Sequence, residues 1–162
     1  MSSLPPFEPL NALTHQGVLL LDTLEKLLEQ EFEALNQRNI DQLQQLIVQK
    51  TDALTQLEEN NTARNQLFIQ AGITPNKAGL QQYCDQLPET QATTFKSQWS
   101  KLEQILHSVN DKNQRNELII SRNSRNLEQL LSILRGQNQK TMLYDQSGEK
   151  GNYSAQSRIG KA

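Results

Sequence analysis

Residues 89–135 decide the fold of this chain, and they read ETQATTFKSQWSKLEQILHSVNDKNQRNELIISRNSRNLEQLLSILR. This run of 47 residues contains neither glycine nor proline, so no residue in it stops a helix. At about 1.5 Å per residue the predicted helix approaches 70 Å in length. Steps of four and three residues alternate along it, which is the heptad pattern of a helix that packs along another helix. The heptad positions are Phe95, Trp99, Leu102, Leu106, Val109, Asn113, Asn116, Ile120, Asn123, Leu127, Leu130 and Leu134.

Two further heptad stripes precede this long helix. The first spans residues 10–37 and the second spans residues 40–72, with about two residues between the helices. Asn39 is suited to cap the second helix, and Gln42 to return a hydrogen bond to the backbone of the cap. A connection this short makes the two helices antiparallel. The stripe positions are Leu13, Gly17, Leu20, Leu24, Leu27, Glu31 and Leu35 in the first helix, and Ile40, Leu43, Ile47, Lys50, Leu54, Leu57, Asn61, Arg64, Phe68 and Ala71 in the second.

Proline and glycine mark the other segments. Three prolines make residues 1–9 an extended arm, and two more bound a break at residues 73–88 that contains a short helix, 77–86. Residues 137–162 carry scattered apolar side chains without a period, which is typical of a flexible, disordered tail. The predicted fold is all-α. It is an elongated antiparallel hairpin with a long third helix, forming a three-helix bundle or coiled coil over residues 1–136, followed by the tail.

The composition excludes several classes of function. A net charge of −2 gives no general attraction to nucleic acid or to anionic lipid. The longest uninterrupted apolar run is four residues, 18–21, so we expect neither membrane insertion nor a signal peptide. A single cysteine, Cys84, excludes an internal disulfide and fits a reducing compartment, so the expected location is the cytoplasm.

Residues with catalytic or metal-binding chemistry are few. His15 and His107 are the two histidines and fall on separate helices, and no Cys-x-x-Cys, Gly-rich loop or cluster of carboxylates accompanies them. We therefore expect no metal, no cofactor and no enzymatic activity. The alternative, a small helical enzyme that works through Cys84 or His107, is testable by replacing both residues with alanine.

Three asparagines occupy seam positions of the long helix, where a polar residue costs stability. Asn113, Asn116 and Asn123 lie within eleven residues of one another. Either their paired amides fix the register of an internal bundle, or the seam opens here and leaves a surface for another molecule.

A second feature of the long helix is a wide apolar arc. Ile105, Ile119 and Ile133 recur at fourteen-residue intervals, or every second heptad, on one flank of the seam, which makes the arc wider than a two-helix contact needs. Either a neighbouring helix of the same chain covers this flank, or it receives an amphipathic helix of a partner.

The order of these residues resembles the FlgN family of flagellar type III export chaperones. The most specific match is the family motif Asn113-Gln114-Arg115-Asn116, followed after Glu117 by the aliphatic residues Leu118 and Ile119. Further along the helix it continues with Asn126, Leu127, Leu130 and Leu131. In the first two helices the similar spacing comprises Leu27, Leu28, Glu31, Leu35, Arg38, Leu43, Lys50, Leu54 and Leu57. In the tail it comprises Thr141, Met142, Leu143, Tyr144, Asp145 and Gly148.

The resemblance implies a cytoplasmic chaperone that binds terminal helices of hook-associated proteins, which form the hook–filament junction, and delivers them to the flagellar export gate. It implies that Tyr144 docks on the cytosolic domain of the gate. The tail continues eighteen residues past that position, so Tyr153 is a second candidate. The client surface implied for the long helix consists of Val109, Leu118, Ile119, Ile120, Leu127, Leu130, Leu131 and Leu134. A structural coiled-coil adaptor or scaffold of the export apparatus is the alternative, since self-association would also bury the stripes.

Overall fold

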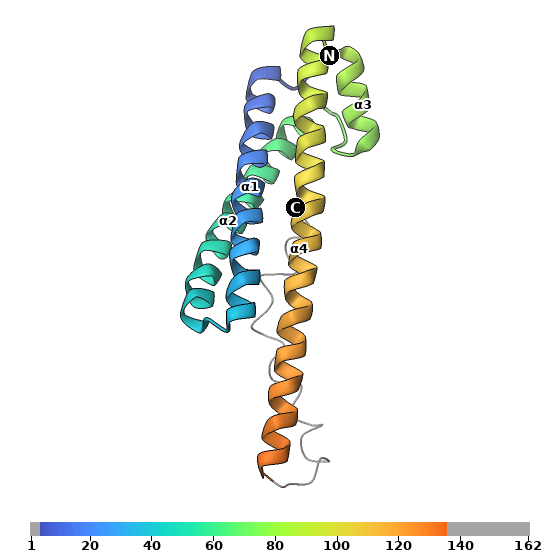
Figure 1. Cartoon of the computed structure of the whole chain (residues 1–162). Helices are drawn as coiled ribbons and strands as arrows, with labels where there is room; N and C mark the ends of the chain where they lie inside the picture. Colours follow the sequence, from blue (N-terminus) through green and yellow to red (C-terminus); the bar gives the residue numbers. More distant parts are fainter. Residues whose placement is uncertain (1–3, 136–162) are drawn as a thin grey trace.

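The computed structural model describes residues 4–135, apart from the side chains of Leu127, Leu130, Leu134 and Arg135. It contains four helices, which are α1 (Phe7–Gln37), α2 (Ile40–Gln70), α3 (Lys77–Gln86) and α4 (Glu89–Arg135). No strand occurs in this part of the chain. The all-α prediction is confirmed, and α1 and α2 form the expected antiparallel hairpin (Figure 1). The predictions for residues 137–162, including those for Tyr144 and Tyr153, lie outside the described residues.

Helix α1 begins earlier than predicted. The expected extended arm ended at residue 9, but α1 starts at Phe7, and Pro6 is its N-cap in an extended conformation. Proline lacks only an N–H group that the first helical turn leaves unbonded, so Pro9 fits inside that turn. The residues before the helix are also packed, because the buried hydroxyl of Tyr83 donates a hydrogen bond to the carbonyl of Pro5 at 3.3 Å.

The turn between α1 and α2 uses the predicted cap with one difference. The side-chain oxygen of Asn39 accepts a hydrogen bond from the backbone N–H of Gln42 at 3.2 Å. The carbonyl oxygen of the Gln42 side chain accepts from the Asn39 side-chain amide at 3.4 Å, whereas the expected partner was the backbone of the cap. Arg38 takes the left-handed conformation, with φ of 55°, and ends α1.

Helix α3 closes one end of the bundle, a packing role that the sequence left open. Its bounds agree with the predicted short helix. The ring of Tyr83 meets those of Phe68 and Phe95 edge to face, with centroid distances of 5.6 Å and 5.1 Å. Gly79 allows α3 to lie against the preceding loop, because a Cβ atom there would lie 1.9 Å from the carbonyl oxygen of Thr74.

Helix α1 is central, since it makes the main contacts with both α2 and α4. Helix α4 runs parallel to α1. Phe95, near the start of α4, shares a buried cluster with Leu10, and Asn116 meets Leu28 further along. Buried leucines of α1 and α2 join Leu102 and Val109 of α4 in the main core.

Gly17, an expected stripe position, marks a close approach of the three long helices. A Cβ atom there would lie 2.8 Å from Oδ1 of Asn60 on α2 and 3.1 Å from Cδ1 of Leu102 on α4. The same Oδ1 accepts a hydrogen bond from Nε of buried Arg64 at 2.8 Å, and the Arg64 guanidinium lies 5.7 Å from the centre of the Trp99 ring. Burial lowers the pKa of Arg64 to about 10, so the side chain stays charged at neutral pH.

Helix α4 runs past the turn between α1 and α2 (Figure 1). Asn116 of α4 lies level with Glu31 of α1. Helix α1 ends at Gln37, six residues after Glu31. Because α1 and α4 are parallel, roughly 13 residues of α4, or about 20 Å, extend beyond the hairpin. We call this part, residues 123–135, the projecting segment.

Asn39→Ala should lower the free energy of unfolding by about 1 kcal/mol, because the backbone N–H of Gln42 loses its capping acceptor. Urea denaturation followed by circular dichroism measures the change. The matched control is Asn36→Ala, an exposed position inside α1, where alanine is the better helix former and stability should not fall. Equal losses at the two positions would contradict the capping role.

Candidate partner-binding surface

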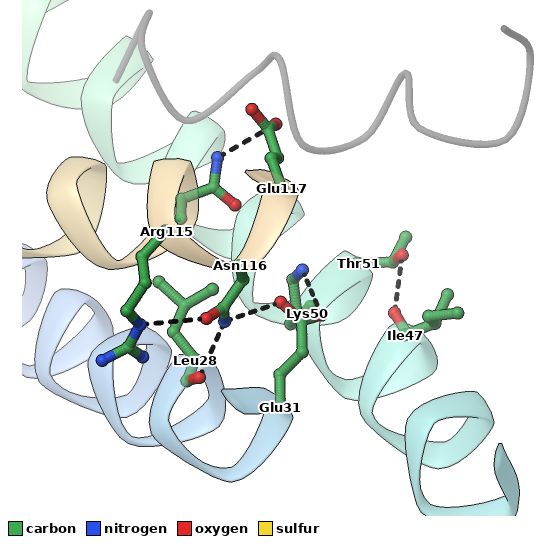
Figure 2. A network of polar contacts seen from close by, with 9 residues as sticks. Leu28, Glu31, Ile47, Lys50, Thr51, Arg115, Asn116 and Glu117 are labelled. Atoms are coloured by element: carbon green, nitrogen blue, oxygen red, sulfur yellow. Dashed lines mark hydrogen bonds and ion pairs between the residues drawn. The ribbon is translucent and has the colours of Figure 1, made fainter. Parts of the chain in front are cut away.

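A buried polar network joins the three long helices (Figure 2). Lys50 of α2 donates to Oε2 of Glu31 on α1 at 2.8 Å, and both side chains are buried. The side-chain amide of Asn116 on α4 donates to Oε1 of Glu31 and to the carbonyl of Leu28, both at 2.9 Å. One carboxylate therefore accepts from two other helices at once.

This network fixes the register of α4 against the hairpin. A buried carboxylate without a partner is costly, so any slip of α4 that removes Asn116 from Glu31 is penalised. Of the two interpretations left open for the seam asparagines, the register role applies to Asn116. Asn113 is also buried, and its amide donates to Glu117 at 3.3 Å. Asn123 is exposed, which means that the seam opens one heptad later.

An ionic contact lies along one flank of the network. Glu29 of α1 accepts from Lys112 and from Arg115 of α4, each at 3.2 Å, and Glu25 accepts from Lys112 at 3.4 Å. The Arg115 guanidinium also lies over the ring of Phe32, at 3.9 Å from its centre. The hydrogen bond from Lys112 and the charges of both cations hold the pKa of Glu29 below its ordinary value.

The apolar arc of α4 becomes more exposed toward its carboxyl end. Ile105 and Ile119 are half-buried, and Ile105 packs against the main core. Ile133, the third member of the series, is 79% exposed. Within residues 4–135, the helices therefore cover the beginning of this flank and leave Ile133 at its end exposed.

The residues predicted for the client surface fall into three groups. Val109 is fully buried against α1 and α2, so it belongs to the core, and its assignment to a client surface is corrected. Ile119 and Ile120 are half-buried and Leu131 is 37% exposed, so these three border the open end. Leu118 is 58% exposed, but it follows Asn116 by two residues and thus lies on the other side of the helix. The side chains of Leu127, Leu130 and Leu134 are outside the described part.

The start of α2 also departs from the prediction. Ile40 and Ile47 were expected on the buried stripe, yet both are exposed, as is Val48. Leu46 is buried in their place, together with Lys50, which was on the expected stripe and forms the ion pair with Glu31. The sequence does contain a signal for this pairing. Glu31 and Lys50 carry opposite charges on the predicted stripes of two helices that are joined by a short turn.

The geometry gives little support to the alternative catalytic and metal-binding sites. Cys84 is buried, and burial raises the pKa of its thiol, which keeps it protonated. His107 is exposed and lies 3.5 Å from Asp111 on its own helix. Among residues 4–135 no group of three or more metal-binding side chains is present. None of the helices in that range is long and apolar enough to cross a membrane.

These features define a class: an elongated all-helical protein in which one helix, held in register by a buried polar network, extends an apolar strip beyond the bundle. The sequence profile of the family described as FlgN protein matches residues 7–152. The chain belongs to the FlgN family. Of the motif residues, Asn116 and Asn113 are buried, while Gln114 is exposed.

The fold is similar to that of a Pseudomonas aeruginosa protein described as a flagella synthesis protein, FlgN, whose crystal structure is known. The TM-score is 0.64 and the sequence identity is 27%, and the match covers 77% of this chain and 94% of the other. No curated protein matches the sequence.

Lys50→Met should lower the free energy of unfolding by about 3–5 kcal/mol, because it leaves the Glu31 carboxylate buried without its cation. Replacing both partners, as in Glu31→Leu with Lys50→Met, should recover most of that loss, since no buried charge is left. Urea denaturation of the single and double variants measures both values. A single variant that costs less than about 1 kcal/mol would contradict the role of the network.

Proposed function

We propose that the protein is a flagellar type III export chaperone that binds the terminal amphipathic helices of hook-associated proteins in the cytosol and delivers them to the export gate. Membership of the FlgN family and the similarity to a flagella synthesis protein support a flagellar role. The single observation that carries the binding proposal is the projecting segment of α4, with its seam and flank left open.

The client surface follows from this geometry. Beyond Gln37 neither α1 nor α2 runs alongside α4 (Figure 1). The heptad stripe nonetheless continues through leucines at 127, 130 and 134, with Leu131 beside it. A helix with an apolar face can therefore add to α4 where the hairpin stops, burying leucines on both partners.

Holding a client in this way suits its chemistry. The terminal segments of a filament-type subunit are amphipathic and remain unfolded until assembly, so their apolar faces would otherwise associate with one another. A single strip on α4 covers such a face without requiring the client to fold. No step of the binding needs a nucleotide or a metal.

Delivery is assigned to the tail, residues 137–162. We place the contact with the cytosolic domain of the export gate at Tyr144, with Tyr153 as the second candidate. This division leaves the open end of α4 for the client and a separate segment for the gate.

Leu131→Asp should weaken binding of a hook-associated terminal segment several-fold, because it places a charge in an apolar contact. The helix content should stay unchanged, since Leu131 already lies partly in solvent. Isothermal titration calorimetry and circular dichroism measure the two quantities. The matched control is Leu19→Asp, an exposed leucine on α1 away from the projecting segment, and it should bind normally.

Equal weakening by both substitutions would contradict the assigned surface.

Light scattering tests the scaffold alternative on the same samples. We expect a one-to-one complex, whereas a stable higher oligomer that ignores the client segment would favour the coiled-coil scaffold.

Deletion of residues 137–162 should leave the affinity for the client segment unchanged and reduce export of hook-associated proteins into the medium. Tyr144→Ala should reproduce the export defect in the full chain, and Tyr153→Ala is its matched control. Loss of client binding in the truncated chain would contradict the division between holding and delivery.

A further inference from the structure

A pair of residue types that contacts α1 occurs twice along α4. Helix α1 provides partners for the first pair and ends before it reaches the second. At the network, the adjacent residues Arg115 and Asn116 of α4 contact two carboxylates of α1, those of Glu29 and Glu31. Seven residues further on, α4 carries the same pair of residue types, Arg122 and Asn123. A seven-residue step returns to nearly the same side of a helix, so this second pair faces the same way as the first.

Helix α1 offers no carboxylate to the second pair. The residues of α1 seven places after Glu29 and Glu31 are Asn36 and Arg38, and the helix ends at Gln37. Arg122 and Asn123 are both exposed, and Arg122 makes no ion pair with any residue of the 4–135 range. The second pair therefore presents an amide donor in the open seam and a positive charge beside it.

We infer that the partner helix bound by the projecting segment carries carboxylates along the flank that faces Arg122 and Asn123, so that it continues on α4 the contact that α1 makes. This inference rests on the proposed function and adds the chemistry of the partner to it. Helix α1 supplies the template: its Glu25 and Glu29 are four residues apart, one turn of helix, and they pair with Lys112 and Arg115. The partner is thus an amphipathic helix with a leucine face and an acidic flank.

The net charge of the open end supports an acidic partner. Residues 121–135 contain Arg122, Arg125 and Arg135 against the single acidic residue Glu128. Over the length where α1 covers α4, by contrast, the cations Lys112 and Arg115 are already neutralised by α1. An acidic flank gains attraction at the open end, whereas a basic flank meets like charge there.

The test uses the full chain and two synthetic amphipathic peptides as probes. Both peptides carry the same leucine stripe, and their flank positions, spaced four residues apart, are glutamate in one and lysine in the other. Fluorescence anisotropy at low ionic strength should show the glutamate peptide binding about fivefold tighter than the lysine peptide. Arg122→Glu should reverse this preference.

The matched control is Arg125→Glu, which makes the same change of charge three residues further along α4. Seven residues before Arg125 lies exposed Leu118, on the side of α4 away from α1, so Arg125→Glu should keep the preference for the glutamate peptide. Equal binding of the two peptides, or equal effects of the two substitutions, would overturn the inference and leave the proposed function standing. Failure of both peptides to bind a folded chain would overturn both.

Discussion

The carboxylate of Glu31 is the group on which the arrangement of the long helices depends. It is buried, and its two oxygens accept from Lys50 of α2 and from Asn116 of α4. Leucine stripes alone allow two helices to slide past each other by a heptad, because each leucine finds an equivalent neighbour. A single buried charge with two dedicated donors removes that freedom, since a slip would leave the carboxylate unpaired.

Fixing the register also fixes which part of α4 lies outside the bundle. With Asn116 level with Glu31, α4 must run past the end of α1, and the residues beyond that point keep a heptad pattern that has no partner in the hairpin. The same types of contact, an apolar seam with a polar residue at its centre and charges along its flank, then become available to another molecule. Under the proposed function, a partner helix would use the same kinds of contact that hold α4 against α1.

Most of the fold could be predicted from the sequence because its signals are local. The glycine- and proline-free run predicted the extent of α4, and Asn39 predicted the start of α2 as its cap. The second stripe was predicted to run to residue 72, but α2 ends at Gln70, two residues before Gly72, which has a φ of 74°. The features that could not be predicted depend on contacts between residues that are far apart in the sequence. Lys50 reaches Glu31 only once the hairpin has formed, and in the folded chain Ile47 is exposed while Leu46 is buried.

The candidate site was predictable in part for the same reason. Heptad spacing identified the stripe that includes Val109 and Leu130, but spacing does not tell where the covering helix ends. Hydrogen–deuterium exchange of the full chain, with and without a terminal segment of a hook-associated protein, tests the central claim most directly. We predict that bound client slows exchange in residues 118–135 and leaves the Glu31 and Lys50 region unchanged. Slowed exchange confined to the hairpin, including the exposed start of α2, would contradict it.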